Sequence, residues 1–91
     1  MPEEMNILRE ILTNRGIKWR DRSDKPGFPL IDLAIYRTRF SFQNKEWSVI
    51  CGYGTYGGDK GLLEVMIGDG DPIGHLTAKD VVNLMDKGVK E

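Results

Sequence analysis

The sequence predicts an α+β domain in which three or four antiparallel strands are flanked by an N-terminal and a C-terminal helix. Three observations predict this class. Apolar residues recur at three- and four-residue spacing near both ends of the chain, as in amphipathic helices. Between them, much of the stretch 33–52 alternates with the two-residue period of strands. The chain has 91 residues, the size of one domain, so we expect a single domain over residues 1–91.

The first helix is expected from Glu3 to Arg15, because four apolar residues fall on one side of it. These residues are Met5, Leu8, Ile11 and Leu12. Gly16 then supplies the left-handed residue that ends many helices. Residues 17–22 alternate apolar and basic side chains, which is typical of a short edge strand with a basic outer face. The sequence leaves open whether this segment joins the sheet.

A hairpin is the firmest strand prediction, with strands at 33–42 and 46–52 and a tight turn at 43–45. A further strand is expected at 62–67. The turn residues from Gly68 to Pro72 cannot continue it, and His75 is read as a loop residue before the last helix. That helix starts at the N-cap Thr77, with Asp80 completing a variant of the capping box, and ends at Gly88.

Both helices are expected to cover one face of the sheet. The other face is then open and displays Arg37 and Arg39, with Lys18, Arg20 and Arg22 as further candidates. All six arginines lie in the first half of the chain: residues 1–45 hold nine Lys and Arg against six Asp and Glu, and residues 46–91 hold four against eight. Such asymmetry either marks two faces with different partners or makes a dipolar domain.

The composition excludes several classes of protein. The net charge of −1 is neither that of a strongly basic nucleic-acid binder nor that of an acidic nucleic-acid mimic. One Cys and one His exclude a disulfide scaffold and a Cys/His metal cluster within one chain. No apolar run approaches the ~20 residues of a membrane span, and the acidic start does not match a signal peptide. We therefore expect a cytoplasmic protein without a membrane partner, metal or cofactor.

A glycine-rich stretch at residues 52–61 contains a literal G-x-G-x-x-G. The dinucleotide fingerprint needs a helix after it, whereas a strand is expected here. The stretch is read as a flexible hairpin loop, as a loop that presents tyrosines to a protein, or as a cradle for a nucleotide or phosphorylated signal. Its candidate partner-binding residues are Tyr53, Thr55, Tyr56, Asp59 and Lys60.

The open face adds Arg37 and Arg39 as candidate binding residues, because arginine pairs bidentately with carboxylate and phosphate. The predicted element order is also that of the double-stranded RNA-binding domain. The start of the last helix lacks that family's basic cluster, so RNA binding stays an alternative. Cys51 is expected to be buried, and no sequence feature brings His75 to it. Asp69 and Asp71 read as a solvated turn rather than a Ca²⁺ site.

A resemblance covers roughly residues 46–87. The segments Trp47–Gly58, Gly61–Glu64 and Gly74–Ala78 resemble short uncharacterised reading frames of phages and prophages. This resemblance implies a small accessory protein, and many such proteins inhibit host defence enzymes, as anti-CRISPR proteins do. It implies no site residues, because no activity is established for the group.

Together these observations predict a non-enzymatic protein-binding module that inhibits a bacterial defence nuclease, with a bacterial host protein as its partner. Small-ligand binding through the glycine-rich loop and nucleic-acid binding through the arginine face are the alternatives. The sequence leaves the oligomeric state open, and a homodimer is compatible with an exposed sheet.

Overall fold

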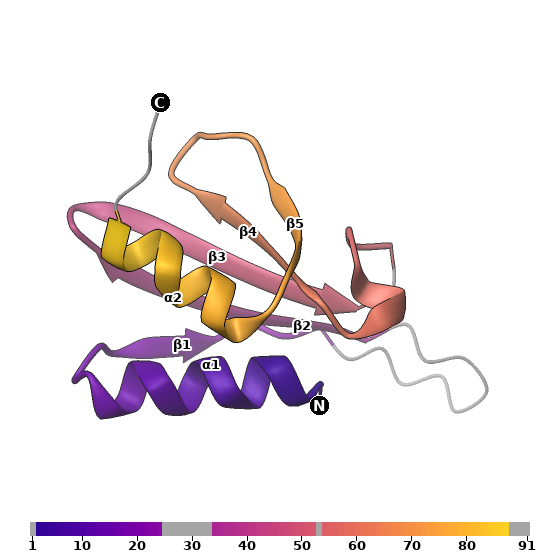
Figure 1. Cartoon of the computed structure of the whole chain (residues 1–91), viewed down its shortest axis with the longest axis horizontal. Helices are drawn as coiled ribbons and strands as arrows, with labels where there is room; N and C mark the ends of the chain where they lie inside the picture. The colour runs from indigo at the N-terminus through magenta and orange to yellow at the C-terminus, as the bar shows by residue number, and fades with distance from the viewer. Residues whose placement is uncertain (1, 25–33, 53, 88–91) are drawn as a thin grey trace.

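The computed structural model describes residues 2–24, 34–52 and 54–87, in which a five-stranded antiparallel sheet packs against two helices (Figure 1). The elements in chain order are α1 (Glu3–Asn14), β1 (Trp19–Asp21), β2 (Ile35–Phe42), β3 (Lys45–Gly52), a 3-10 helix (Gly58–Lys60), β4 (Leu63–Ile67), β5 (Ile73–Leu76) and α2 (Ala78–Lys87). The strands lie in the sheet in their chain order. The predicted α+β class with a helix at each end is confirmed.

The sheet has five strands, so the prediction of three or four was too low. The segment at 17–22 does join the sheet, as the edge strand β1. The strand that the sequence did not predict is β5, and the reading of His75 as a loop residue is corrected. The pairing of β4 with β5 shifts register at this point, and His75 has a φ of 60°. Such a bulge breaks the two-residue alternation on which strand prediction depends.

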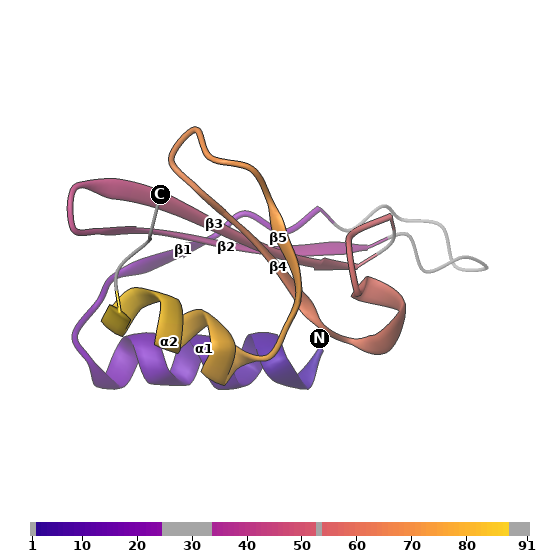
Figure 2. The ribbon, with the colours of Figure 1, turned by 45° about the horizontal axis from the view of Figure 1, so that its top comes forward.

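Both helices cover the same face of the sheet, as Figure 2 shows. The core fills the space between these two layers, as expected for an α+β domain. Its fully buried side chains come from both helices and from the helix-facing sides of the three central strands. They include Met5, Leu8, Leu12, Phe40, Val49, Leu63, Val65, Val81 and Met85. The predicted two-layer arrangement, with the second sheet face left open, is therefore confirmed.

The ends of the helices follow the local sequence signals. Helix α1 ends in a Schellman motif, in which Gly16 has a φ of 73° and the Ile17 amide donates to the Leu12 carbonyl at 2.9 Å. At the start of α2, the Thr77 amide donates to Asp80 Oδ2 at 2.9 Å, and the Asp80 amide donates to Thr77 Oγ1 at 3.1 Å. The predicted capping box is confirmed. Gly88, the predicted end of this helix, lies outside the described residues.

The predicted hairpin is confirmed with small changes at its ends. Phe42 pairs with Lys45, so the turn consists of the two residues Gln43 and Asn44. Both have positive φ, of 52° and 64°, which is the geometry of the type I′ turns that match the twist of a hairpin. The register then runs without a break to the pair of Ile35 and Gly52.

The two helices run in the same direction and are joined at both ends. Glu4 Oε1 accepts the Ala78 amide at 2.8 Å, so a side chain of α1 caps the first turn of α2. Arg15 and Asp86 form a two-pronged ion pair at 2.7 and 3.1 Å near the other ends of the helices. Within the described ranges, neither helix has the length and apolar character that a bilayer span requires.

Candidate functional site

The sheet surface that faces away from both helices is the candidate site, and we call it the open face. Its residues alternate in sequence with those of the core, so strand register decides which side chains meet there. Its members on the four strands from β1 to β4 are Arg20, Ile35, Arg37, Arg39, Ser41, Glu46, Ser48, Ile50, Glu64 and Met66. The two predicted arginines, Arg37 and Arg39, are both on this face.

Glu46 forms an ion-pair cluster at the hairpin end of the open face. One of its carboxylate oxygens accepts a hydrogen bond from Arg20 and lies 3.3 Å from Arg39 Nε in an ion pair. The other oxygen accepts a hydrogen bond from Ser41 Oγ at 3.0 Å. The hydrogen bond from Arg20 lowers the pKa of Glu46, with smaller contributions from Ser41 and Arg39. Glu46 therefore neutralises part of the charge of the two arginines and fixes how they lie.

A second row of side chains crosses the middle of the open face. Arg37 lies opposite Ile50, and Ile50 lies opposite Glu64, so the row runs from basic through apolar to acidic. Glu64 Oε1 accepts the backbone amide of Tyr56 at 2.8 Å. The row is thereby connected to the glycine-rich loop. Tyr56 is 60% exposed, and its Cβ lies directly against Gly74 of β5.

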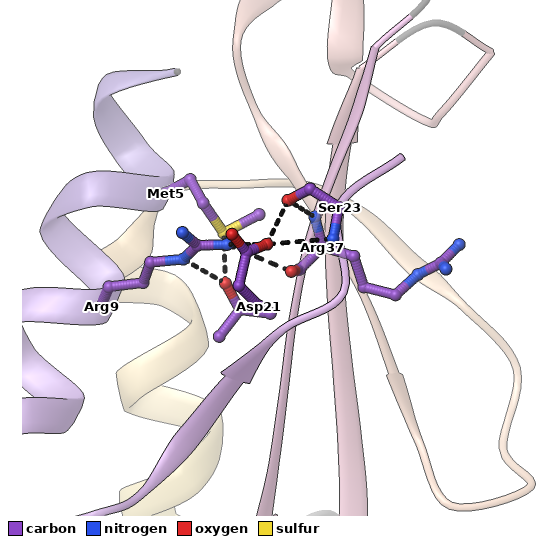
Figure 3. Close-up of polar contacts among 6 residues, drawn as sticks. Met5, Arg9, Asp21, Ser23 and Arg37 are labelled. Atoms are coloured by element: carbon purple, nitrogen blue, oxygen red, sulfur yellow. Dashed lines mark hydrogen bonds and ion pairs between the residues drawn. The ribbon is translucent and has the colours of Figure 1, made fainter. Parts of the chain in front are cut away.

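A buried arginine lies on the other side of the sheet beneath Arg37, and Figure 3 shows its contacts. Arg9 of α1 donates from Nε to Thr38 Oγ1 at 2.7 Å. Its Nη2 donates at 3.1 Å both to Asp21 Oδ1 and to the Arg37 carbonyl. Its guanidinium also lies 4.7 Å from the centre of the Trp19 ring, a cation–π distance. The Nε and Nη2 groups of this buried arginine therefore both have hydrogen-bond partners, as buried polar groups usually do.

The same cluster holds the Arg37 backbone from both sides. Its carbonyl accepts from Arg9 and from the Arg22 amide, and its own amide donates to Ser23 Oγ at 3.0 Å. Ser23 Oγ in turn donates to Asp21 Oδ1 at 2.6 Å. The Arg37 side chain points away from Arg9, toward the open face (Figure 3). The backbone of Arg37 is therefore held by Arg9 of α1 and by Ser23, and Asp21 joins Ser23 to Arg9.

Asp21 gives this cluster a pH dependence. Hydrogen bonds from the Ser23 hydroxyl and amide lower its pKa from 3.8 to about 2, and Arg9 adds to the shift. Because the folded-state pKa is depressed, its stabilising effect is complete above the unfolded value and is lost as the pH falls toward about 2.

We expect the free energy of unfolding, measured by urea titration, to fall between about pH 5 and about pH 2. Ser23→Ala removes the largest cause of the shift, so this variant is expected to show a smaller loss of stability over that range. An equally steep loss in Ser23→Ala contradicts this account of Asp21.

The glycine-rich loop joins β3 to β4 and is closed by its own hydrogen bonds. Thr55 Oγ1 accepts the Gly52 amide at 3.0 Å and donates to the Gly52 carbonyl at 2.8 Å. Gly58 packs so closely that a Cβ there would lie 2.1 Å from the Gly52 carbonyl oxygen. Thr55 thus stabilises the loop, and the Tyr56 side chain is exposed. Tyr53, the other predicted contact tyrosine, lies outside the described residues.

The other loop residues of the predicted site, Asp59 and Lys60, are exposed on the short 3-10 helix. Asp59 borders a hollow of about 530 Å³ that Tyr36 and Cys51 also line, from the helix-covered side of the sheet. Asp59 is the one charged residue among the described residues that line this hollow. A phosphate group would therefore meet a carboxylate there and no described cation, which weighs against a nucleotide cradle at this loop.

The Cys51 thiol is buried, and burial raises its pKa, so it stays protonated at neutral pH. His75 lies on β5, and β4 separates that strand from the β3 strand of Cys51. Asp69 and Asp71 are exposed in the turn between β4 and β5. In the part of the chain that the structure describes, no three His, Cys, Asp or Glu side chains are placed to hold a metal ion.

The fold and the site define a small α+β module with one sheet face covered by helices and one left open. Comparison of the chain with protein-family models, with curated proteins and with solved structures finds no match to any of them. The function of the chain is therefore inferred from its own residues.

Three residues that organise the site were missed by sequence reasoning: Arg9, Glu46 and Glu64. The sequence does contain a signal that Arg9 is buried. Arg9 lies four residues after Met5 and three before Leu12, next to the apolar stripe of the first helix. A charged residue at such a position needs buried partners. Glu46 and Glu64 had no comparable signal, since their roles depend on which strands become neighbours.

Proposed function

We propose that this chain is a non-enzymatic protein-binding module and that the open face, together with Tyr56, is its binding surface. The observation that carries the proposal is the cross-strand row of Arg37, Ile50 and Glu64, with exposed Tyr56 at its end. Met66, which is 41% exposed, adds a further apolar side chain to the face. Interfaces combine apolar contact area, aromatic residues and arginine in this way.

The strand edges support a face rather than an edge as the binding surface. An exposed edge can add a strand from another chain, and proteins prevent this with short strands, bulges and charges. Here β1 has three residues between Lys18 and Arg22, both exposed. At the other edge, β5 has four residues and an irregular register. Both edges therefore carry the features that hinder strand addition.

The target that we propose is a bacterial defence nuclease, which the chain would inhibit by binding. The resemblance of residues 46–87 to phage and prophage reading frames supports this target class. Glu46 and Glu64 on the open face favour a protein over a nucleic acid, since carboxylates repel the phosphate backbone.

A capture experiment tests the proposal. The tagged chain is incubated with a lysate of bacteria that express a defence nuclease, at low and moderate salt, and mass spectrometry identifies the retained proteins. We expect one nuclease in equimolar amount, released by Tyr56→Ala and by Arg39→Glu, and we expect the purified nuclease to lose activity when the chain is added. Lys79→Glu makes the same change of charge at an exposed position of α2. This variant is the matched control and should retain the nuclease.

The melting temperatures of the variants are measured in parallel, because a variant that unfolds would also release its partner. Retention of nucleic acid alone, lost at moderate salt, contradicts the proposal, because such binding depends on the release of counterions. A nuclease that is retained equally by Tyr56→Ala and Arg39→Glu places the binding surface elsewhere.

A further inference from the structure

Four arginines form a block on the open face. Arg20 of β1 lies opposite Arg39 of β2 in the sheet register. The register continues past the end of β1, where the Arg22 amide donates to the Arg37 carbonyl at 3.0 Å and places these two residues opposite each other. Like charges directly opposite on neighbouring strands destabilise a sheet. The block therefore needs anions to balance it.

One half of the block already has its anion. Glu46 accepts a hydrogen bond from Arg20 and forms an ion pair with Arg39. The other half, Arg22 and Arg37, forms no ion pair with any residue of the described ranges. Asp24 is the next acidic residue along this edge, and its described contacts are backbone hydrogen bonds to Ile35. The block thus has two anion positions, of which Glu46 occupies one.

The backbone at the second anion position, that of Arg22 and Arg37, is fixed by hydrogen bonds. The Arg37 carbonyl accepts from Arg9 and from the Arg22 amide, and the Arg37 amide donates to Ser23 Oγ. The half-buried Arg37 side chain points away from Arg9 (Figure 3). A fixed backbone lowers the entropic cost of binding, because fewer torsions have to be ordered when a ligand arrives. Ile50 lies directly across the strand from Arg37 and offers an apolar contact beside it.

We infer that the Arg22–Arg37 position binds a carboxylate of the partner protein, from an Asp or Glu that has an apolar residue next to it. This inference rests on the proposed function and names the chemistry of the partner. The carboxylate takes the place that Glu46 has in the other half of the block, and guanidinium groups bind it through paired N–H···O bonds. The adjacent apolar side chain packs on Ile50.

Two other occupants fit the face less well. A second copy of this chain, docked face to face with β3 against β3, would place its Glu64 against Arg37, but it would place β5, which has no acidic residue, against Arg22. A nucleic acid offers a run of phosphates, whereas the described residues of this face provide one open anion position and two carboxylates, Glu46 and Glu64. A single acidic side chain in an otherwise mixed surface matches the charges of the open face.

Selection from a random peptide library tests the inference. The full chain is immobilised, and peptides are selected against the natural protein and against Arg37→Glu and Lys79→Glu. We expect the natural protein and Lys79→Glu to enrich peptides with Asp or Glu beside an apolar residue. Binding of these peptides should weaken at least about tenfold in Arg37→Glu and in Arg22→Glu, the loss of a charge-assisted pair.

Each other result overturns the inference. Selected peptides without acidic enrichment, or peptides that Arg37→Glu binds equally well, overturn it while leaving the protein-binding function intact. If no peptide is selected and a duplex oligonucleotide binds, this result overturns both the inference and the proposed protein-binding function. The inference is also overturned if neither a peptide nor an oligonucleotide binds, or if sedimentation shows a dimer that Arg37→Glu dissociates.

Two controls accompany these measurements. Circular dichroism checks that each variant is folded. Arg37→Lys, which keeps the charge, should bind the selected peptides more tightly than Arg37→Glu.

Discussion

Replacing Arg9 with alanine is expected to lower the free energy of unfolding by about 3 kcal/mol. The side chain is buried and makes three hydrogen bonds, to Thr38, Asp21 and the Arg37 carbonyl, besides its contact with the Trp19 ring. Hydrogen bonds to charged groups contribute about 1.5–3 kcal/mol each, and Thr38 keeps one other partner in Met5 Sδ, which limits the loss. Urea unfolding followed by tryptophan fluorescence measures the effect.

Arg15→Ala is the matched control for Arg9→Ala. Arg15 belongs to the same helix and also forms an ion pair with an aspartate, but both partners are exposed. We expect this variant to leave the free energy of unfolding nearly unchanged, because exposed ion pairs contribute little. If Arg9→Ala and Arg15→Ala are equally stable, the Arg9 cluster does not hold α1 to the sheet. Arg9→Ala should also weaken partner binding even where it remains folded, since it releases the Arg37 backbone.

Replacing Gly58 with alanine is also expected to cost about 3 kcal/mol. An added Cβ would lie 2.1 Å from the Gly52 carbonyl oxygen and 2.3 Å from Thr55 Oγ1, so the loop has to open. Opening breaks the hydrogen bonds between Thr55 and Gly52 and moves Tyr56. A loss of this size lowers the melting temperature of a domain this small by at least about 12 °C, which differential scanning calorimetry resolves.

Gly61→Ala separates this close contact from backbone strain. Gly61 has a φ of 72°, but nothing lies within 4 Å of the position of its Cβ. We expect the change to cost about 1 kcal/mol, the penalty for a left-handed non-glycine residue. Equal losses in Gly58→Ala and Gly61→Ala would mean that the loop has room at Gly58, contrary to the packing described above.

Local signals in the sequence predicted those parts of the fold that depend on neighbours in the chain. The capping box of Thr77 and Asp80 involves residues three apart, and the Gln43–Asn44 turn joins strands whose alternation is regular. Such contacts form between residues that are already close, so their spacing is visible in the sequence. The strand β5 was missed because its bulge at Gly74 and His75 becomes favourable only through pairing with β4 and contact with Tyr56.

The α+β class, the two-layer arrangement and the presence of Arg37 and Arg39 on the open face were all predictable from the sequence. Helix and strand periods fix which side of an element is apolar. Tertiary structure alone decided that Glu46 lies between Arg20 and Arg39, that Arg9 holds the base of Arg37, and that Tyr56 is joined to Glu64. These contacts join residues between seven and 28 positions apart. Strand pairing and the packing of α1 create them, and neither can be read from the spacing of residues along the chain.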